Sequence, residues 1–493
     1  MNIKQYNRNQ LFLIPLDLRD WISENHPVWF VMEVVDTLDL TDFYERLRED
    51  GRGGKSYDPQ MLVGLLLYAY CNGVQSSRQI ERLSETDVPF RIMAWNQRVD
   101  HTTICRFRKQ NERALEGLFA QILELCFESG LGHLGTVALD GTKIAGNASL
   151  SENRTRKHLT KEVRRMLSFA NQTDAFEDRK YGKDKRGDEL PDALRGAERL
   201  HRLQEAKARL DASAEKRRAK QAAKLARWEA KKAKRKKRGR RPADPDSLPE
   251  SNEKANMTDP DSRIMKTRNG FIQGYNGQLV VDAGQLILAC DLTQDGNDCH
   301  QLVPMLEQAE RNCAQFTGQR IGNFLADSGY LSEENLKIVY ARDQHPELYL
   351  PASSAKRRLL AEKKRSEEDG QPTANVTGPD SRKGKKKETA KQKKRACNLP
   401  LTIAMEEKVR SEEGKKVYAQ RGWIVEGVNG QIKHGRGLNR FSRRGLSACR
   451  SEWSLFCSSH NLMKLYTALK KFLIWIVAIT LNCAQNREQL CTV

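Results

Sequence analysis

The chain has 493 residues, 38% of them hydrophobic, which is enough to bury a sizeable core divided into two or three units. Lys and Arg total 85 against 64 Asp and Glu, a formal net charge of +21. Such an excess raises the local concentration of phosphates and gives salt-dependent affinity that ignores base sequence. The hydrophobic content therefore excludes a chain that is only an unfolded charged tail, and the positive charge predicts nucleic acid as the partner.

The cysteines and the chain ends favour a cytoplasmic protein. Eleven cysteines are scattered without a Cys-x-x-Cys pair, so neither a zinc site nor a disulfide framework is indicated. Residues 1–10 are mostly polar and lack the apolar core of a signal peptide. The apolar stretch from Phe472 to Leu481 is shorter than the roughly 20 residues that cross a bilayer, so we expect a buried terminal helix there and no membrane contact.

The first 130 residues have helical periodicity, with apolar side chains at three- and four-residue spacing. Hydroxyl caps are expected before the helix that starts near Ser76, and Asp100 is placed to cap another helix. That second helix would present polar groups suited to phosphates or base edges, as in a helix-turn-helix reader: Thr102, Thr103, Arg106 and Lys109. We predict a helical DNA-binding domain over residues 1–130; a capped, exposed surface helix is the alternative for this segment.

Strand signals begin at Leu134 and return at residues 274–282 and 286–293, which the turn residues Ala283 and Gly284 separate into a hairpin. A helix over residues 301–313 follows, then a strand that ends at Asp327 and a helix that Ser332 starts. Strand, hairpin, helix, strand and helix in this order predict a ribonuclease-H-like α/β catalytic core over residues 131–470.

Two basic insertions interrupt this core. The first covers about residues 147–254; its middle, residues 194–237, is rich in Ala, Arg, Glu and Lys and predicts a long helix or helical hairpin. The run of basic residues at 231–241 predicts a mobile linker that contacts phosphates, or simply a solvated face. The second insertion, about residues 356–395, has no apolar periodicity and should be disordered. Residues 471–493 form a tail.

Three acidic residues lie in settings that suit metal-dependent chemistry. Asp140 ends an apolar run, Asp327 ends another, and Glu426 lies in a segment of helical character. Carboxylates at the tips of two buried strands, with a third on a helix, can hold divalent metal ions where a phosphodiester is attacked in line. Each Asp alone is weak evidence, because Asp commonly caps turns. Close backbone approach of a ligand is favoured by the glycines Gly141 and Gly329.

If residues 418–433 are helical, Glu426 and Lys433 fall within roughly 20° of each other, and Tyr418 and Arg421 lie beside them on an arc of about 140°. One face would then carry an acid, two bases and a ring. Glycines in this segment each cost a helix about 1 kcal/mol relative to Ala, so packing or DNA must stabilise it. A surface helix with scattered charges is the alternative.

Other carboxylates compete with these three for a role in the site. They are Asp259, Asp261, Asp282, Asp291, Asp295 and Asp298. Asp291 is predicted on a strand next to the first one and could support a metal ligand from behind. Capping and turn roles suit Asp259 and Asp261, which flank Pro260. His300 is a candidate metal ligand, although a lone His more often starts a helix.

The sequence resembles the bacterial insertion-sequence DDE transposases that have a helical amino-terminal domain and a Tyr-Arg-Glu-Lys signature. The signature residues are Tyr418, Arg421, Glu426 and Lys433, and the likeness runs from about Gln10 to Lys464. Further segments carry the resemblance: residues 76–81, 100–104, 139–143, 258–266, 274–278 and 326–330. The tail after about residue 465 departs from the family pattern, and the two insertions vary in length in such proteins.

The resemblance implies a metal-binding catalytic triad of Asp140, Asp327 and Glu426, with Arg421 and Lys433 near transposon-end phosphates and Tyr418 stacking or positioning beside them. It implies Mg²⁺ as cofactor, with Mn²⁺ able to substitute; one ion would activate water and then a freed 3′-hydroxyl while a second, about 3.5 to 4 Å away, neutralises the leaving oxygen. Double-stranded DNA, both transposon ends and target, is the implied partner of a nucleoid-associated bacterial homodimer.

Two other functions are kept open. The unusual tail is compatible with a catalytically silent, transposase-derived DNA-binding protein. A structure-selective nuclease on the same fold would cut branched DNA without needing an inverted repeat and would not join ends.

Overall fold

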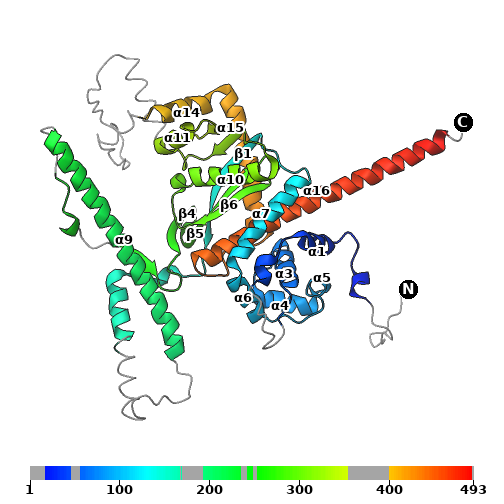
Figure 1. The fold of residues 1–493 in the computed structure, drawn as a ribbon, viewed down its shortest axis with the longest axis horizontal. Helices are drawn as coiled ribbons and strands as arrows, with labels where there is room; N and C mark the ends of the chain where they lie inside the picture. The colour runs from blue at the N-terminus through cyan, green and yellow to red at the C-terminus, as the bar shows by residue number, and fades with distance from the viewer. Residues whose placement is uncertain are drawn as a thin grey trace, which may run out of the picture.

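The computed structural model describes residues 17–45, 56–166, 168, 193–234, 241–247, 253–353 and 399–490. A group of amino-terminal helices lies at one end, a mixed sheet with its helices lies in the middle, and the long helix α9 projects to one side (Figure 1). Helix α16 runs from the helical group past the sheet and beyond it. The predicted second insertion, residues 356–395, lies outside the described residues.

The amino-terminal region is helical, as predicted. Its elements are η1 (Leu18–Trp21), α1 (Pro27–Thr37), α2 (Thr41–Tyr44), α3 (Pro59–Cys71), α4 (Ser77–Thr86), α5 (Val88–Met93), α6 (His101–Gln110) and α7 (Glu112–Glu128). Asp58 caps α3 by accepting from Gln60 N at 2.8 Å, and α3 then buries nearly every side chain. Asp100 caps α6 as expected. Ser76 stands at the N-cap of α4, but its hydroxyl does not cap the helix.

The sheet has six strands: β1 (Thr136–Ala145), β4 (Arg263–Thr267), β5 (Gly270–Asp282), β6 (Ile287–Thr293), β7 (Asn323–Ala326) and β8 (Glu347–Tyr349). Their order is β4-β5-β1-β7-β8, with β6 also paired to β5. The β6-β5-β1 ladders are antiparallel and the β1-β7-β8 ladders are parallel. The sheet is therefore mixed, and the predicted hairpin of β5 and β6 is confirmed.

Strand β1 does not end at Asp140, contrary to the prediction. It continues to Ala145, because β5 is 13 residues long and pairs with it from Val137 to Ala145. The parallel partner β7, in contrast, stops at Ala326, opposite Leu139. Asp140 thus lies within its own strand but at the point where the neighbouring parallel strand ends.

The sheet and the helical group share one hydrophobic core. Its buried side chains run from Val28 in α1 through β1 and β5 to Leu465 in α16. The covering helices are α10 (Leu302–Thr317), α11 (Glu333–Tyr340), α14 (Pro400–Arg410), α15 (Glu412–Gly430) and α16 (Leu446–Leu490). Helix α16 packs on both α7 and β6, so it joins the two regions.

The first insertion contains the predicted long helix, α9 (Ala193–Lys234). It also contains a small ladder of β2 (Asn153–Thr155) and β3 (Lys254–Asn256). A second, separate cluster of buried side chains holds this unit together: Leu159, Val163, Leu203, Ala206, Leu210 and Ala255. Only part of the predicted basic linker is described, since residues 235–240 lie outside the described segments.

Residues 472–481, for which we expected a buried terminal helix, are helical within α16. Their side chains lie outside the described part of the structure. No helix in the described part of the chain combines the length and apolar character of a bilayer span.

Candidate functional site

Asp140 lies on β1, and Asp327 directly follows the neighbouring parallel strand β7. The ladder of β1 and β7 pairs Leu139 with Ala326, so the next residue on each chain is one of the two aspartates. Because β7 ends at Ala326, the parallel ladder stops there and leaves this edge of β1 without a strand partner. The structure therefore brings together two of the three predicted catalytic carboxylates, from residues 187 positions apart.

Helix α15 covers Asp140 and binds both of its carboxylate oxygens. Arg421 Nη2 donates to Asp140 Oδ1 at 2.7 Å, and Asn429 Nδ2 donates to Asp140 Oδ2 at 2.9 Å. The helix begins at Glu412, and Ser411 caps it with a hydroxyl that accepts from Gly414 N at 3.0 Å. Arg421 and Asn429 are two turns apart, so both can face the same strand. The helix therefore contacts Asp140 through Arg421, one of the predicted site residues, and through Asn429, which was not expected in the site.

Burial raises the pKa of Asp140 to about 6, and the negative charges of Asp327 and Asp298 add to the effect, while Arg421 opposes it. The Asp140 side chain keeps 21% of its surface exposed and Arg421 keeps 16%. The charges of Asp327 and Asp298 thus act on Asp140 against the guanidinium of Arg421. Asp140 and Asp327 supply hard oxygen atoms, the kind of ligand that Mg²⁺ prefers, and a cation beside them would offset these charges.

Asp298 is the acidic residue that the sequence placed only among rivals. It belongs to the short helix η4 (Asp298–His300) that precedes α10. Its Oδ1 accepts from Asn276 Nδ2 at 2.7 Å and from Gln278 Nε2 at 3.0 Å, both from β5. The polar Asn276 and Gln278 in the buried strand β5 were the available sequence signal, because buried amides need hydrogen-bond partners.

Two glycines lie against the acidic side chains of the site. A Cβ at Gly141 would lie 2.5 Å from Asp298 Oδ1 and 2.7 Å from Gln278 Nε2. A Cβ at Gly329 would lie 2.9 Å from Asp327 Oδ1 and 3.7 Å from Asp298 Oδ2. At both positions an added Cβ would crowd a polar side-chain atom of the site, so that side chain would have to shift.

Glu426 lies on the exposed side of α15 and does not join Asp140 and Asp327. Among the residues that the structure describes, no group of three or more His, Cys, Asp or Glu side chains is close enough to hold a metal ion. Glu426 shares its helix with Arg421 and Asn429, which contact Asp140. The structure thus brings the helix to the site without bringing this carboxylate into the cluster.

The other signature residues lie along the same helix and its extension. Lys433 stands in the π-helical turn η5 (Gln431–Gly435), and its Nζ donates to the backbone oxygen of Lys143 at 3.4 Å. Burial lowers the pKa of Lys433, while the nearby charge of Asp140 opposes the shift. Tyr418 is half-buried and packs against the core.

The predicted DNA-reading helix is α6. Arg106 and Lys109 are exposed on it, whereas the hydroxyls of Thr102 and Thr103 both donate to the Asp100 carboxylate. The neighbouring Arg108 is buried instead: Nη2 donates to Tyr70 at 2.6 Å and lies 3.6 Å from the buried Glu452 of α16.

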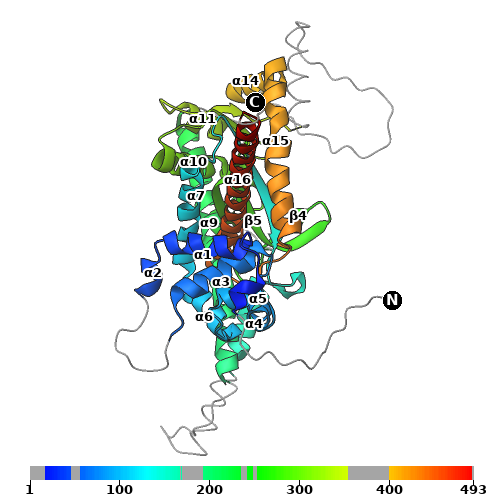
Figure 2. The ribbon, with the colours of Figure 1, turned by 90° about the vertical axis from the view of Figure 1, so that its right-hand side faces the viewer.

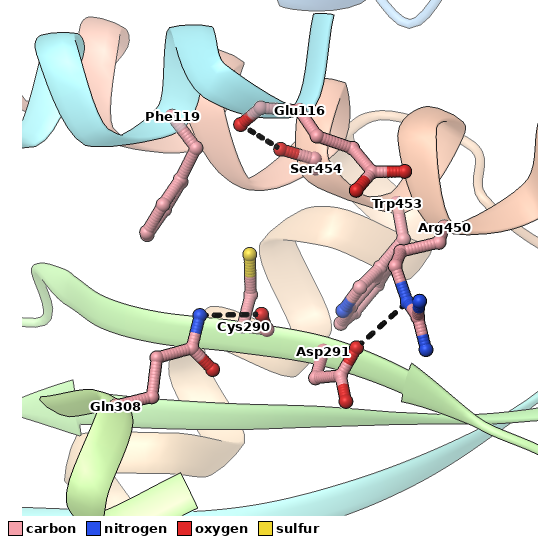
Figure 3. A pocket seen from close by; sticks show the side chains of 8 residues that line it. All are labelled: Glu116, Phe119, Cys290, Asp291, Gln308, Arg450, Trp453 and Ser454. Atoms are coloured by element: carbon pink, nitrogen blue, oxygen red, sulfur yellow. Dashed lines mark hydrogen bonds and ion pairs between the residues drawn. The ribbon is translucent and has the colours of Figure 1, made fainter. Parts of the chain in front are cut away.

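The remaining acidic candidates have other partners. Asp291 forms an ion pair with Arg450 at 2.9 Å and faces a cavity of about 370 Å³ between α7, β6 and α16, as Figure 3 shows. It therefore does not support Asp140. Asp259 accepts from the buried Tyr275 hydroxyl at 2.8 Å, and Asp282 accepts backbone N–H groups of His133 and Leu286.

Two family models match the chain. A transposase domain (DUF772) matches residues 16–110, and a transposase DDE domain matches residues 243–462. The second match contains Asp327 and all of α15, whereas Asp140 lies between the two matched spans. No curated protein and no solved structure gives a significant match.

These two matches, with the paired aspartates at the sheet edge, define the class of the protein as a transposase. The chain belongs to the insertion-sequence DDE transposases.

Proposed function

We propose that the protein binds the terminal inverted repeats of an insertion sequence, cleaves DNA at their ends with a divalent metal ion and joins those ends to a target. The observation that carries this proposal is the juxtaposition of Asp140 and Asp327 beneath the Arg421 and Asn429 side chains of α15. The order of the strands and their mixed directions support a ribonuclease-H-like assignment for the sheet.

In this proposal Asp140 and Asp327 hold the cation, Mg²⁺ or in its place Mn²⁺, and Glu426 is the third carboxylate of the set. When bound, metal ions of this kind activate the attacking oxygen and neutralise charge on the leaving oxygen. Asn429 and Arg421 hold the Asp140 carboxylate in one orientation. Because Glu426 is on the same helix, a small rotation or shift of α15 on binding DNA would change its distance from the aspartates.

The DNA contacts belong to two surfaces. Near the aspartates, Arg421 and Lys433 would bind transposon-end phosphates, with Tyr418 positioned beside them. On α6, Arg106 and Lys109 have exposed cationic groups for phosphates, while Thr102 and Thr103 stabilise the first turn of the helix through Asp100 and would contact DNA from there. Holding two ends at once would require a homodimer on DNA, in the bacterial nucleoid.

The test uses a labelled DNA fragment that carries one end of the element. With Mg²⁺ the wild-type protein should cut at the end, and with EDTA it should bind without cutting. The Asp140→Asn and Glu426→Gln variants should lose cleavage and keep binding. Asp291→Asn is the matched control, because Asp291 faces the separate cavity of Figure 3, and it should cut normally.

Binding without any cleavage by the wild-type protein would instead identify a catalytically silent DNA-binding descendant. Cleavage of branched DNA that lacks the repeat, without joining, would identify a structure-selective nuclease. Full cleavage by Glu426→Gln alone would remove this carboxylate from the metal set and leave the aspartate pair in place.

A further inference from the structure

A groove opens at the carboxyl end of β1, on the strand that carries Asp140. It has a volume of about 560 Å³ and is bordered by four parts of the chain: the end of β1 with the residues after it, the segment between β3 and β4, the β4–β5 hairpin and the loop between α15 and α16. We call it the hairpin groove. Its lining side chains include Asn147, Ser149, Phe271, Arg440 and Arg444, and no Asp or Glu lies among them.

The loop between α15 and α16 is fixed against the end of β1. Phe441 N donates to Ala145 O at 2.8 Å, and Arg444 Nε donates to Asn147 O at 3.0 Å. The side chain of Asn147 donates in return to Ser442 O at 2.9 Å. The two arginines of the groove, Arg440 and Arg444, therefore extend from a fixed backbone, and both are exposed.

The β4–β5 hairpin adds an apolar surface to this basic groove. Phe271 is 61% exposed and Ile264 is 47% exposed. The register pairs Lys266 with Phe271 and Ile264 with Gln273, so Ile264, Lys266 and Phe271 lie on one face of the hairpin. Figure 2 shows the hairpin projecting from the sheet beside the lower end of α15.

A line of cations connects the groove to the aspartate pair. Lys433 donates to Lys143 O at 3.4 Å, and Lys143 Nζ donates to Lys266 O at 3.1 Å. Asp140 and Ala145 are five residues apart on β1, which spans about 17 Å of extended strand. That length equals roughly five steps of a stacked DNA strand at 3.4 Å per nucleotide.

We propose that the hairpin groove binds an unpaired segment of the DNA strand that passes the catalytic carboxylates, with Phe271 stacking on a base and Arg440 and Arg444 binding its phosphates. An aromatic ring beside a basic groove is the combination by which proteins bind single strands without sequence preference. The groove has the volume of a small-ligand site, which favours a single strand over a duplex. This inference rests on the proposed function.

The test measures binding in EDTA, so that cleavage is not required. The probes are fluorescent oligothymidine of about 12 nucleotides, which is long enough for such a groove, and a duplex of the same length. Phe271→Ala should weaken oligothymidine binding by about fivefold to a hundredfold and leave duplex binding unchanged. Phe271→Trp should restore it. Ile338→Ala is the control, because Ile338 is 46% exposed on α11, away from the groove.

Charge is tested with Arg440→Ala against Arg320→Ala, both at exposed positions. Only Arg440→Ala should weaken the single strand and reduce its salt dependence by about one phosphate contact. A duplex with a single-stranded tail tests the distance: tails of about eight nucleotides should respond to Phe271→Ala, and tails of about three should not reach the groove.

Equal oligothymidine affinity of Phe271→Ala and the wild type would overturn the inference, as would an equal loss of single-strand and duplex binding. A change in oligomeric state caused by Phe271→Ala, without a change in DNA binding, would make the hairpin a contact between two copies and also overturn it. These outcomes are independent of end cleavage, so a silent transposase could still bind single strands in this groove.

Discussion

The buried histidine of α16 gives a quantitative test of the described packing. His460 is 0% exposed, and its Nε2 donates to Gln285 O at 2.8 Å in the turn between β5 and β6. Its Nδ1 has no partner among the described residues. Burial lowers the pKa of His460 from 6.5 to about 3, and the cationic Arg436 and Lys464 lower it further, while the bond to Gln285 opposes the shift.

The direction of the pH effect follows from these values. Below pH 6.5 the unfolded chain binds a proton at His460 and the folded chain does not, so stability falls as the pH falls from 6.5 towards 3. At pH 5 the difference is about 1.5 pKa units, which at 1.36 kcal/mol per unit is roughly 2 kcal/mol. At pH 7.5 the unfolded chain leaves His460 largely neutral as well, so this loss of folding free energy is almost absent.

The measurement is urea unfolding followed by tryptophan fluorescence at pH 7.5 and pH 5, with wild type and His460→Gln. The glutamine amide can still donate to Gln285 O but does not titrate, so the wild type should lose about 2 kcal/mol more than the variant between these conditions. His158→Gln, at an exposed position, should behave as wild type. Parallel responses of wild type and His460→Gln would refute a neutral, buried His460.

Three further changes have expected outcomes. Gly141→Ala should reduce cleavage at least tenfold, because its Cβ would lie 2.5 Å from Asp298 Oδ1. The control is Gly117→Ala on α7, whose Cβ meets nothing within 4 Å and which should stabilise the helix by up to about 1 kcal/mol. Equal cleavage activity of the two variants would contradict the close packing at Gly141. Glu452→Gln should destabilise the fold by about 3 kcal/mol in urea unfolding, because it leaves the buried charge of Arg108 without its carboxylate partner. The double variant Arg108→Met with Glu452→Leu should be less destabilised than Glu452→Gln, and a larger loss would show that the pair stabilises the fold beyond its desolvation cost.

Local signals predicted much of the fold. The hairpin of β5 and β6, the long helix α9 and the Asp100 cap of α6 each depend on residues close together in sequence. The extension of β1 beyond Asp140 was missed, because residues 141–143 are polar and only pairing with the long β5 makes them strand. Strand β4 was missed for the same reason.

The site was predicted in part. Asp140 and Asp327 could be paired because both follow apolar strand-like runs, and strands of that kind tend to pair in one sheet. The partners Asn429 and Asp298 depend on how α15 and η4 pack on the sheet, which periodicity does not reveal. The position of Glu426 depends on the rotation of α15 about its own axis. That rotation decides whether Glu426 lies on the exposed face of the helix or on the face towards the aspartates.

The continuous core has a consequence for engineering. Because α16 packs on α7 as well as on β6, and Arg108 of α6 reaches Glu452, the amino-terminal helices are not a detachable module. A chimaera that exchanged these helices to retarget the protein would need a complementary α16 surface. If α6 contacts DNA as proposed, changes to its exposed side chains, such as Arg106 and Lys109, would leave this shared core intact, whereas grafting a foreign helical domain would not.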